Sequence, residues 1–160
     1  KEVIFSTSLL LGCVSLAEMF LVSDPPTKAE LTQAQAYVKK VLAAHLPQLK
    51  PETKIIAVAG TPTSLVAIRD KIWPYQPEKV HGQTLTKQEI DQLAQQLSSL
   101  PLAARKKVVG LQPQRAEVIV SGTVILQVIL TSLKLGSIIV SERDILDGII
   151  FSLVNLAQKP

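Results

Sequence analysis

The chain has 160 residues, of which 47% are hydrophobic and 19% charged, which excludes intrinsic disorder and predicts one domain over residues 1–160. The formal charge of +4 suits a polyanionic partner, but only 4% of the residues are aromatic, so few rings can stack on nucleic-acid bases. Cys13 is the single cysteine, which excludes an internal disulfide and fits a reducing compartment. We therefore expect a cytoplasmic domain that binds neither nucleic acid nor a membrane.

The first quarter of the chain predicts one strand segment and two helices. Residues 2–11 are rich in Val, Ile, Phe and Thr and predict a strand or a bent pair of strands. A helical pattern over residues 14–21 stops at the Asp-Pro-Pro sequence that follows. Thr27 and Glu30 then form a capping box, which opens a helix that ends before Pro47.

The next segment has the pattern of an anion site. Residues 55–59 predict a short buried strand, and Gly60 permits a tight turn into a helix that closes at the following Trp-Pro pair. Thr61 is a suitable N-cap and Pro62 suits the first helical position, where its missing N–H costs nothing. Free N–H groups and the positive end of the helix dipole would face a ligand beyond the strand.

Residues 75–84 predict a loop, and a second capping box at Thr86 and Glu89 opens another helix. A short helix is expected from Pro101 to a C-terminal glycine at Gly110.

The last part of the chain predicts a long core helix, a strand and a terminal helix. Pro113 opens the long helix, which runs to about Leu133. Its apolar stretch, residues 118–133, carries Gln127 and Thr131 and falls short of the roughly 20 residues that a membrane span requires. Residues 137–141 then predict a buried strand and residues 145–156 the terminal helix.

Long helices separate the predicted strands 55–59 and 137–141, so these strands are expected to pair in parallel. Ligands of such sheets bind beyond the carboxyl ends of the strands. Gly60 and Thr61 follow one strand, and Ser141-Glu142-Arg143 follow the other.

Four sequence blocks occur in an order and spacing typical of one family. The blocks are residues 8–20 (SLLLGCVSLAEMF), 57–65, 79–85 (KVHGQTL), and 100–122 with the downstream 140–148. Together they resemble the second half of the exopolyphosphatase and guanosine-pentaphosphate phosphohydrolase family, in the superfamily of sugar kinases, Hsp70 and actin.

This resemblance implies a helix-rich α/β domain of RNase H-like fold, the second domain of its protein, packing on an N-terminal domain of the same chain. Polyphosphate or guanosine pentaphosphate would lie in the cleft between the domains, with Mg²⁺ assisting hydrolysis. The glycine-rich strand of the family would precede Lys1, so the sheet would be truncated. Residues 2–11 would then be separated from the parallel pair, leaving strand edges that favour a homodimer.

The resemblance also assigns substrate-binding residues. Gly60, Thr61 and Thr63 match the superfamily's glycine-rich segment, and Arg115 matches the family arginine expected to contact the polyanion. A guanidinium suits that role because it binds phosphate oxygens in pairs. From the residues alone, Arg115 would be read as a helix-surface arginine. No residue of this chain is predicted to be catalytic or to bind a metal.

Two departures from the family leave alternatives open. The family's phosphate loops and acidic residues are expected ahead of Lys1, so this chain alone is predicted to be inactive. Leu146 also replaces an arginine of the family's Gly-Leu-Arg-Glu-Gly sequence. The first alternative is therefore a non-enzymatic phosphate- or nucleotide-binding module. The second is a lipoprotein domain, because residues 10–13 (LLGC) resemble a lipobox.

Overall fold

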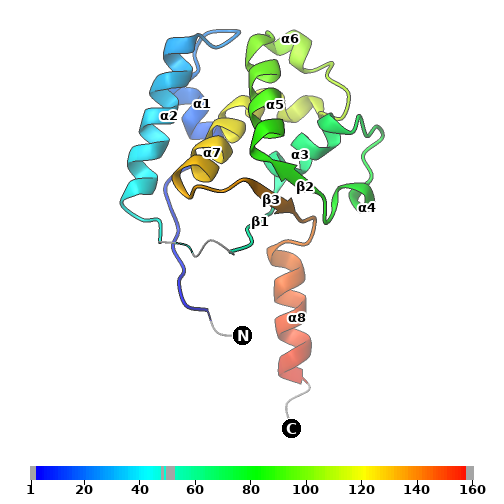
Figure 1. Ribbon diagram of the computed structural model, residues 1–160. Coiled ribbons are helices and arrows are strands. Elements are labelled where there is room, and N and C mark those ends of the chain that lie inside the picture. Colours follow the sequence, from blue (N-terminus) through cyan, green and yellow to red (C-terminus); the bar gives the residue numbers. More distant parts are fainter. Residues whose placement is uncertain (1–2, 48, 50–52, 158–160) are drawn as a thin grey trace.

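The computed structural model describes residues 3–47, 49 and 53–157 (Figure 1). Within this part a small sheet carries helices on one side, and the last helix projects away from the body. The elements in chain order are α1 (Cys13–Phe20), α2 (Lys28–Ala43), β1 (Ile56–Ala57), α3 (Gly60–Arg69), α4 (Pro77–Val80), β2 (Thr84–Thr86), α5 (Lys87–Ser99), α6 (Leu102–Arg105), the 3₁₀ helix η1 (Pro113–Arg115), α7 (Ile119–Ser132), β3 (Ser137–Val140) and α8 (Ile145–Ala157).

The sheet has the strand order β1-β3-β2. β1 and β3 are parallel, with Ile56 opposite Ile139, which confirms the predicted parallel pair. β2 is antiparallel to β3, with Leu85 opposite Ile138. Neither β2 nor α4 was expected, and the prediction of a loop over residues 75–84 was wrong. The pairing with β3 turns this short polar segment into a strand.

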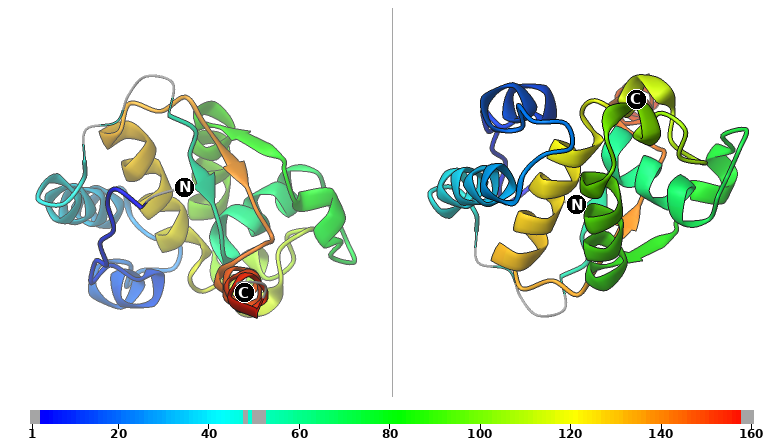
Figure 2. Two further views of the ribbon diagram at one scale, coloured as in Figure 1. Left: turned by 90° about the horizontal axis from the view of Figure 1, so that it is seen from below. Right: turned by 90° about the horizontal axis from the view of Figure 1, so that it is seen from above.

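One face of the sheet is covered and the other is open. Leu85, Ile138 and Val140 are buried under the helices. On the opposite face, Ile56 and Val58 are 64% and 47% exposed. Seen from below, the strands lie uncovered, and the N-terminal segment and α8 both extend to this side (Figure 2). Parallel strands are normally buried on both faces, so an open apolar face is unusual for this pair.

α7 is the central helix of the body and lies between α2 and α5 (Figures 1 and 2). It separates one hydrophobic cluster around Leu16 and Val38 from a larger one around Leu65 and Ile138. This confirms the predicted core helix. The helix does not run unbroken from Pro113, however. The N–H groups of Ala116 and Val118 bond to carbonyls three residues earlier, so a 3₁₀ turn precedes α7.

The short helix predicted from Pro101 is also shorter than expected. α6 ends at Arg105, and Gly110 lies five residues beyond it. Gly110 adopts a φ of 89°, and a Cβ there would lie 2.1 Å from the carbonyl oxygen of Ala67 on α3. Gly110 therefore permits a close backbone contact with α3, and it does not end α6.

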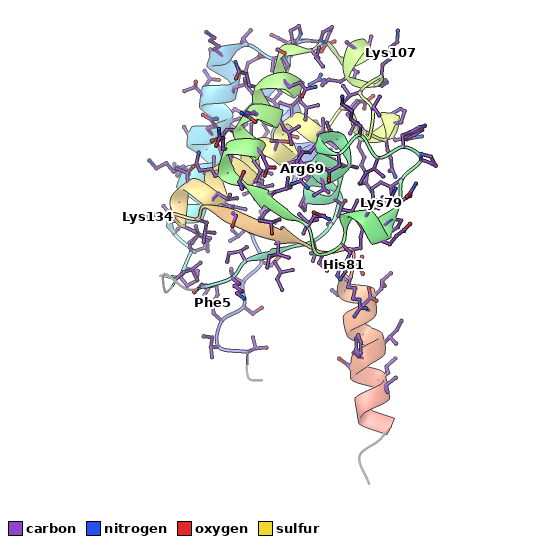
Figure 3. All side chains as sticks on the ribbon, turned by 45° about the vertical axis from the view of Figure 1, so that its right-hand side comes forward. Phe5, Arg69, Lys79, His81, Lys107 and Lys134 are labelled. Carbon is purple, nitrogen blue, oxygen red and sulfur yellow. The ribbon has the colours of Figure 1, made fainter. Side chains whose placement is uncertain are left out.

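The strand predicted over residues 2–11 is wrong for the described residues 3–11. These residues pair with neither edge of the sheet. Val3 and Ile4 are 79% and 95% exposed, and Phe5 lies on a segment that hangs below the body (Figure 3). β propensity alone does not form a strand, because the backbone needs a neighbouring strand to bond with.

No helix in the described ranges is both long and apolar enough to span a membrane. Nine residues of the apolar helix α7 are buried within the body.

Both predicted capping boxes are present. Glu30 accepts hydrogen bonds from the N–H groups of Thr27, Ser23 and Val22, at 2.6, 2.9 and 3.1 Å, and so anchors both ends of the α1–α2 connection. The backbone donors of Thr27 and Ser23 lower the pKa of Glu30 to about 2. Thr86 and Glu89 form the second box, at the start of α5.

Glu30 should make stability sensitive to acid. Its pKa is lower in the folded chain than in the unfolded chain, so its contribution is present above the unfolded value of 4.5 and is lost as the pH falls towards 2. The variant Glu30→Gln should lose part of this pH dependence in urea unfolding curves. Glu18→Gln, at an exposed position of α1, is the matched control. An identical acid dependence in wild type and Glu30→Gln would contradict this assignment.

Candidate functional site

The turn from β1 into α3 starts two residues earlier than predicted. Ala59 is the N-cap and Gly60 the first helical residue, so the assignment of Thr61 as N-cap was wrong. Ala59 has φ 73° and ψ −172°, a backbone conformation that glycine adopts far more readily. The sharp turn attributed to Gly60 is therefore made by Ala59.

Gly60 serves a different purpose, because the side chain of Arg115 packs over it. A Cβ at Gly60 would lie 3.2 Å from the Cζ atom of the guanidinium. Nη1 of Arg115 donates a hydrogen bond of 3.1 Å to the carbonyl oxygen of Gly60. The missing side chain thus allows the guanidinium to lie flat against the first turn of α3.

Ser64 also holds the guanidinium of Arg115 in place. Its hydroxyl accepts a hydrogen bond of 2.9 Å from Nη1 of Arg115, and its side chain is only 2% exposed. Nε and Nη2 of Arg115 make no hydrogen bond within the described part of the chain. The Nε–Nη2 edge is one that binds two oxygens of a phosphate group at once.

Thr61 points towards α7. Its Oγ1 would lie 2.2 Å from a Cβ built on Gly122, so the threonine side chain occupies the space that a residue larger than glycine would fill. The side chain of Thr61 therefore packs between α3 and α7. Its backbone N–H can still donate to a ligand at the start of α3.

Thr63 is 4% exposed, and its hydroxyl donates to the carbonyl oxygens of Ala59 and Gly60, at 3.1 and 3.3 Å. The structure thus brings Gly60, Thr61, Thr63 and Arg115 together at the start of α3. Their assignment as phosphate contacts remains a prediction.

A cavity of about 270 Å³ lies beside this turn. Arg115 is the only charged residue among those that line it, and most of the others are apolar. The lining residues are Cys13, Val58, Ala59, Gly60, Thr61, Pro62, Arg115, Val118 and Ile119.

A second group of polar residues follows β3 at the same edge of the sheet. The hydroxyl of Tyr75, on the loop between α3 and α4, donates a hydrogen bond to Oε1 of Glu142. The N–H of Glu142 donates to Nδ1 of His81 at 3.2 Å. Burial, followed by the hydrogen bond to Glu142, raises the pKa of Tyr75 to about 12, while Thr63 and Arg115 act in the opposite direction.

The Mg²⁺ implied by the resemblance requires a cluster of oxygen ligands. The described ranges contain no group of three His, Cys, Asp or Glu side chains arranged to hold a metal ion. Glu142 is a single carboxylate here, and one of its oxygens already accepts from Tyr75. Mg²⁺ prefers several oxygen ligands in octahedral geometry, so these residues do not form a magnesium site by themselves.

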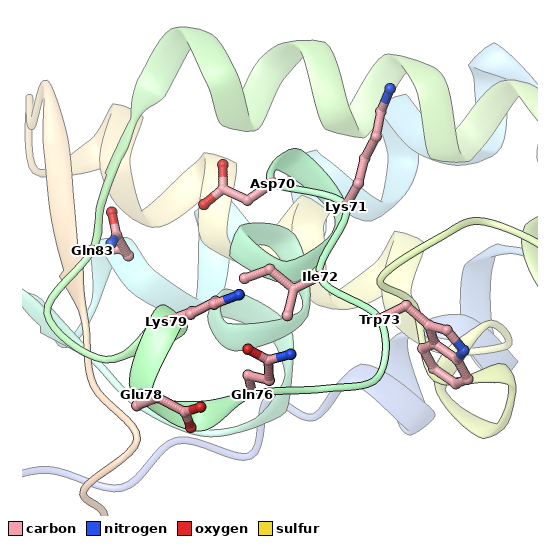
Figure 4. A pocket seen from close by; sticks show the side chains of 8 residues that line it. All are labelled: Asp70, Lys71, Ile72, Trp73, Gln76, Glu78, Lys79 and Gln83. Atoms are coloured by element: carbon pink, nitrogen blue, oxygen red, sulfur yellow. The ribbon is translucent and has the colours of Figure 1, made fainter.

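A larger pocket, of about 560 Å³, lies at the other end of α3 (Figure 4). Its charged residues are Asp70, Lys71, Glu78 and Lys79, so the two signs balance. This balance does not favour a polyanion, and the site at the start of α3 is the better candidate.

Sequence reasoning missed Ser64, Tyr75 and His81 as members of this region. Ser64 lies four residues after Gly60, so the helical repeat places both on one face of α3, and this spacing was a usable signal. Tyr75 and His81 reach the site through a loop and a short helix whose path the sequence does not reveal.

The fold defines the class of protein. Matches to solved structures include the Aquifex aeolicus PPX-GPPA enzyme, with a TM-score of 0.87, 32% identity, and coverage of 94% of this chain and 50% of that one. Another crystal structure of the Aquifex aeolicus family member gives a TM-score of 0.86 at 31% identity, with coverage of 93% and 48%. The helix-rich α/β architecture of the RNase H-like superfamily is therefore confirmed.

The chain belongs to the Ppx/GppA phosphatase family, whose family model matches residues 1–157. It is 32% identical to exopolyphosphatase 2 of Mycobacterium tuberculosis, over 95% of this chain and 50% of that protein. It is 35% identical to a bifunctional 3-dehydroquinate synthase/phosphatase of Fusobacterium nucleatum, over 89% of this chain and 22% of that protein. The chain thus spans half or less of the length of these relatives.

Replacing Gly122 by alanine should push α3 and α7 apart. The new Cβ would overlap Oγ1 of Thr61, and overpacking of this kind costs roughly 1–3 kcal/mol in the free energy of unfolding. Removing that oxygen with Thr61→Ala in the same chain should restore most of the loss, as measured by urea denaturation. Gly136→Ala is the control, because a Cβ there meets nothing within 4 Å. A double variant as unstable as Gly122→Ala alone would contradict the proposed contact.

Proposed function

We propose that this chain is the C-terminal half of a phosphohydrolase that releases phosphate from inorganic polyphosphate, guanosine pentaphosphate or both. Its membership of the Ppx/GppA phosphatase family and its similarity to exopolyphosphatase 2 support this activity for the whole protein. The chain would supply one side of the substrate cleft. The cytoplasm, where such substrates are found, is the compartment we propose for it.

The observation that carries the proposal is the position of Arg115. The guanidinium is held by Ser64 and Gly60 at the start of α3, with its Nε–Nη2 edge free of bonds to the described residues. The N–H groups of the first helical turn and the positive end of the helix dipole lie at the same place. Phosphate groups are the ligands that such an arrangement binds best.

We propose that the other half of the protein covers the open face of the sheet. Ile56 and Val58 are exposed there, and α8 leaves the body with apolar side chains facing solvent. These are Ile145, Leu146, Ile149, Ile150, Phe151, Leu153 and Val154, each between 49% and 77% exposed. A surface this apolar on a helix that projects from the body indicates a partner, and the half of the relatives' length that this chain does not span supplies one.

Mg²⁺ and the acidic catalytic groups would then belong mainly to that other half. Hydrolysis of a phosphoanhydride requires groups that neutralise the transferred phosphoryl and position a water molecule. The basic side of the cleft described here can hold and orient a polyanion. A homodimer formed through the same apolar face is the competing assembly. Light scattering measures the mass of the chain in solution, and the mass of a dimer would indicate this homodimer.

A non-enzymatic binding module is the second candidate. Leu146 favours it, because this residue stands in the first turn of α8 where the family carries an arginine, and its side chain is 65% exposed. One cation that would face a polyanion is therefore missing from this chain.

Arg115 should be needed for binding inorganic tripolyphosphate. Arg115→Lys keeps the charge but loses the paired hydrogen bonds, so its affinity should fall roughly 10-fold, and that of Arg115→Ala further. Titration calorimetry measures both. Lys107→Ala removes one exposed positive charge elsewhere and should change affinity little. Equal losses of affinity in Arg115→Ala and Lys107→Ala would show that binding depends on net charge and not on the position of Arg115.

The chain alone should release no phosphate from polyphosphate. The same chain extended through its natural N-terminal half should do so in the presence of Mg²⁺, because the catalytic carboxylates would then be present. A phosphate-release assay compares the two. Turnover by residues 1–160 at the rate of the extended protein would overturn this division of labour. Binding without turnover in the extended protein would favour the non-enzymatic module.

A further inference from the structure

Glu142 places a carboxylate at the edge of the sheet where the anion site lies. β1 and β3 are parallel, so their carboxyl ends meet at one edge, with α3 and Arg115 beyond β1 and Glu142 beyond β3. A negative charge at this position opposes the binding of a polyanion, because like charges repel strongly where solvent is partly excluded. A carboxylate that opposes ligand binding at this position requires a physical explanation.

The Tyr75 hydroxyl connects the carboxylate to the anion site. It donates to Oε1 of Glu142, while the hydroxyl of Thr63 and the positive charge of Arg115 act to lower its pKa against burial and Glu142, which raise it. With a pKa of about 12, this hydroxyl keeps its proton at physiological pH and remains a hydrogen-bond donor. The half-buried phenol therefore carries a permanent donor beside the basic edge of the site.

The backbone that carries Glu142 is held in place as well. The N–H of Glu142 donates to Nδ1 of His81, so this nitrogen is the acceptor of the bond. The hydroxyl of Ser141 accepts from the N–H of Arg143 at 3.1 Å and donates to its carbonyl oxygen at 3.0 Å. The turn that carries Glu142 is thus fixed at several points, and its carboxylate stays beside Tyr75.

We propose that Tyr75 is a phosphate contact of the cleft and that Glu142 occupies its hydroxyl until a polyanion displaces it. Carboxylate and phosphate oxygens accept from the same donor, and two anions do not share one hydroxyl proton. A chain of phosphates also bound by Arg115 can displace the carboxylate, whereas released orthophosphate competes less well. The inference rests on the proposed function, and it adds a specificity residue and its internal competitor to that site.

Substitutions of Glu142 and of Tyr75 should therefore have opposite effects on the affinity for tripolyphosphate. Glu142→Gln removes the competing charge, so the affinity of the chain for tripolyphosphate should rise roughly 3- to 10-fold, and this gain should shrink at high ionic strength. Tyr75→Phe removes the donor, so affinity should fall by a similar factor. Glu78→Gln makes the same charge change on α4 and is the control. Titration calorimetry at two salt concentrations measures all four proteins.

The outcomes separate this inference from the function on which it rests. Weaker binding by Glu142→Gln, or a gain equal to that of Glu78→Gln, overturns the competitor role even if Arg115→Ala abolishes binding as expected. Absence of tripolyphosphate binding in wild type and in Glu142→Gln alike contradicts both proposals. If Tyr75→Phe does not fold, as judged by urea denaturation, Glu142→Gln alone decides the question.

Discussion

The close approach of α3 to α7 is the constraint on which the candidate site depends. Gly122 has no side chain, so Thr61 can pack directly against the backbone of α7. This contact sets the distance between the strand-to-helix turn and the residues just ahead of α7, among them Arg115. With α7 so placed, the guanidinium reaches Gly60 and Ser64 and is held there by two hydrogen bonds. A larger residue at position 122 would move the arginine and the helix start apart.

Strain and burial are concentrated at the same turn. Ala59 holds a backbone conformation that costs a residue with a side chain roughly 1–3 kcal/mol. The buried Thr63 donates its hydroxyl to the carbonyl oxygen of Ala59, and Ser64 beside it in sequence is also buried. The surrounding packing therefore maintains a conformation that the local sequence would not choose. Conformations of this kind cluster at functional sites, which agrees with the proposed role of the turn in binding phosphate.

The open side of the molecule complements this rigid site. The uncovered face of the sheet, the extended N-terminal segment and α8 lie on the same side of the molecule (Figures 1 and 2). Each of them carries exposed apolar residues. The carboxyl ends of β1 and β3 border this region, so a partner covering the face would close over Arg115, Tyr75 and Glu142. Water exclusion by that partner would strengthen every charge interaction in the cleft.

The sequence by itself determined most of the helices, the parallel strand pair and the family. The capping boxes, the parallel pair and the core helix follow from side-chain spacing and backbone preference, which act over a few residues. Only the tertiary structure decided which elements found partners. Residues 3–11 have strand propensity but no neighbouring strand, whereas residues 84–86 become a strand because β3 lies beside them. Likewise α3 begins one residue before Thr61, whose side chain packs against Gly122 of α7, and Tyr75 meets Glu142 across 67 positions of sequence. Such contacts depend on the path of the whole chain, which local patterns do not encode.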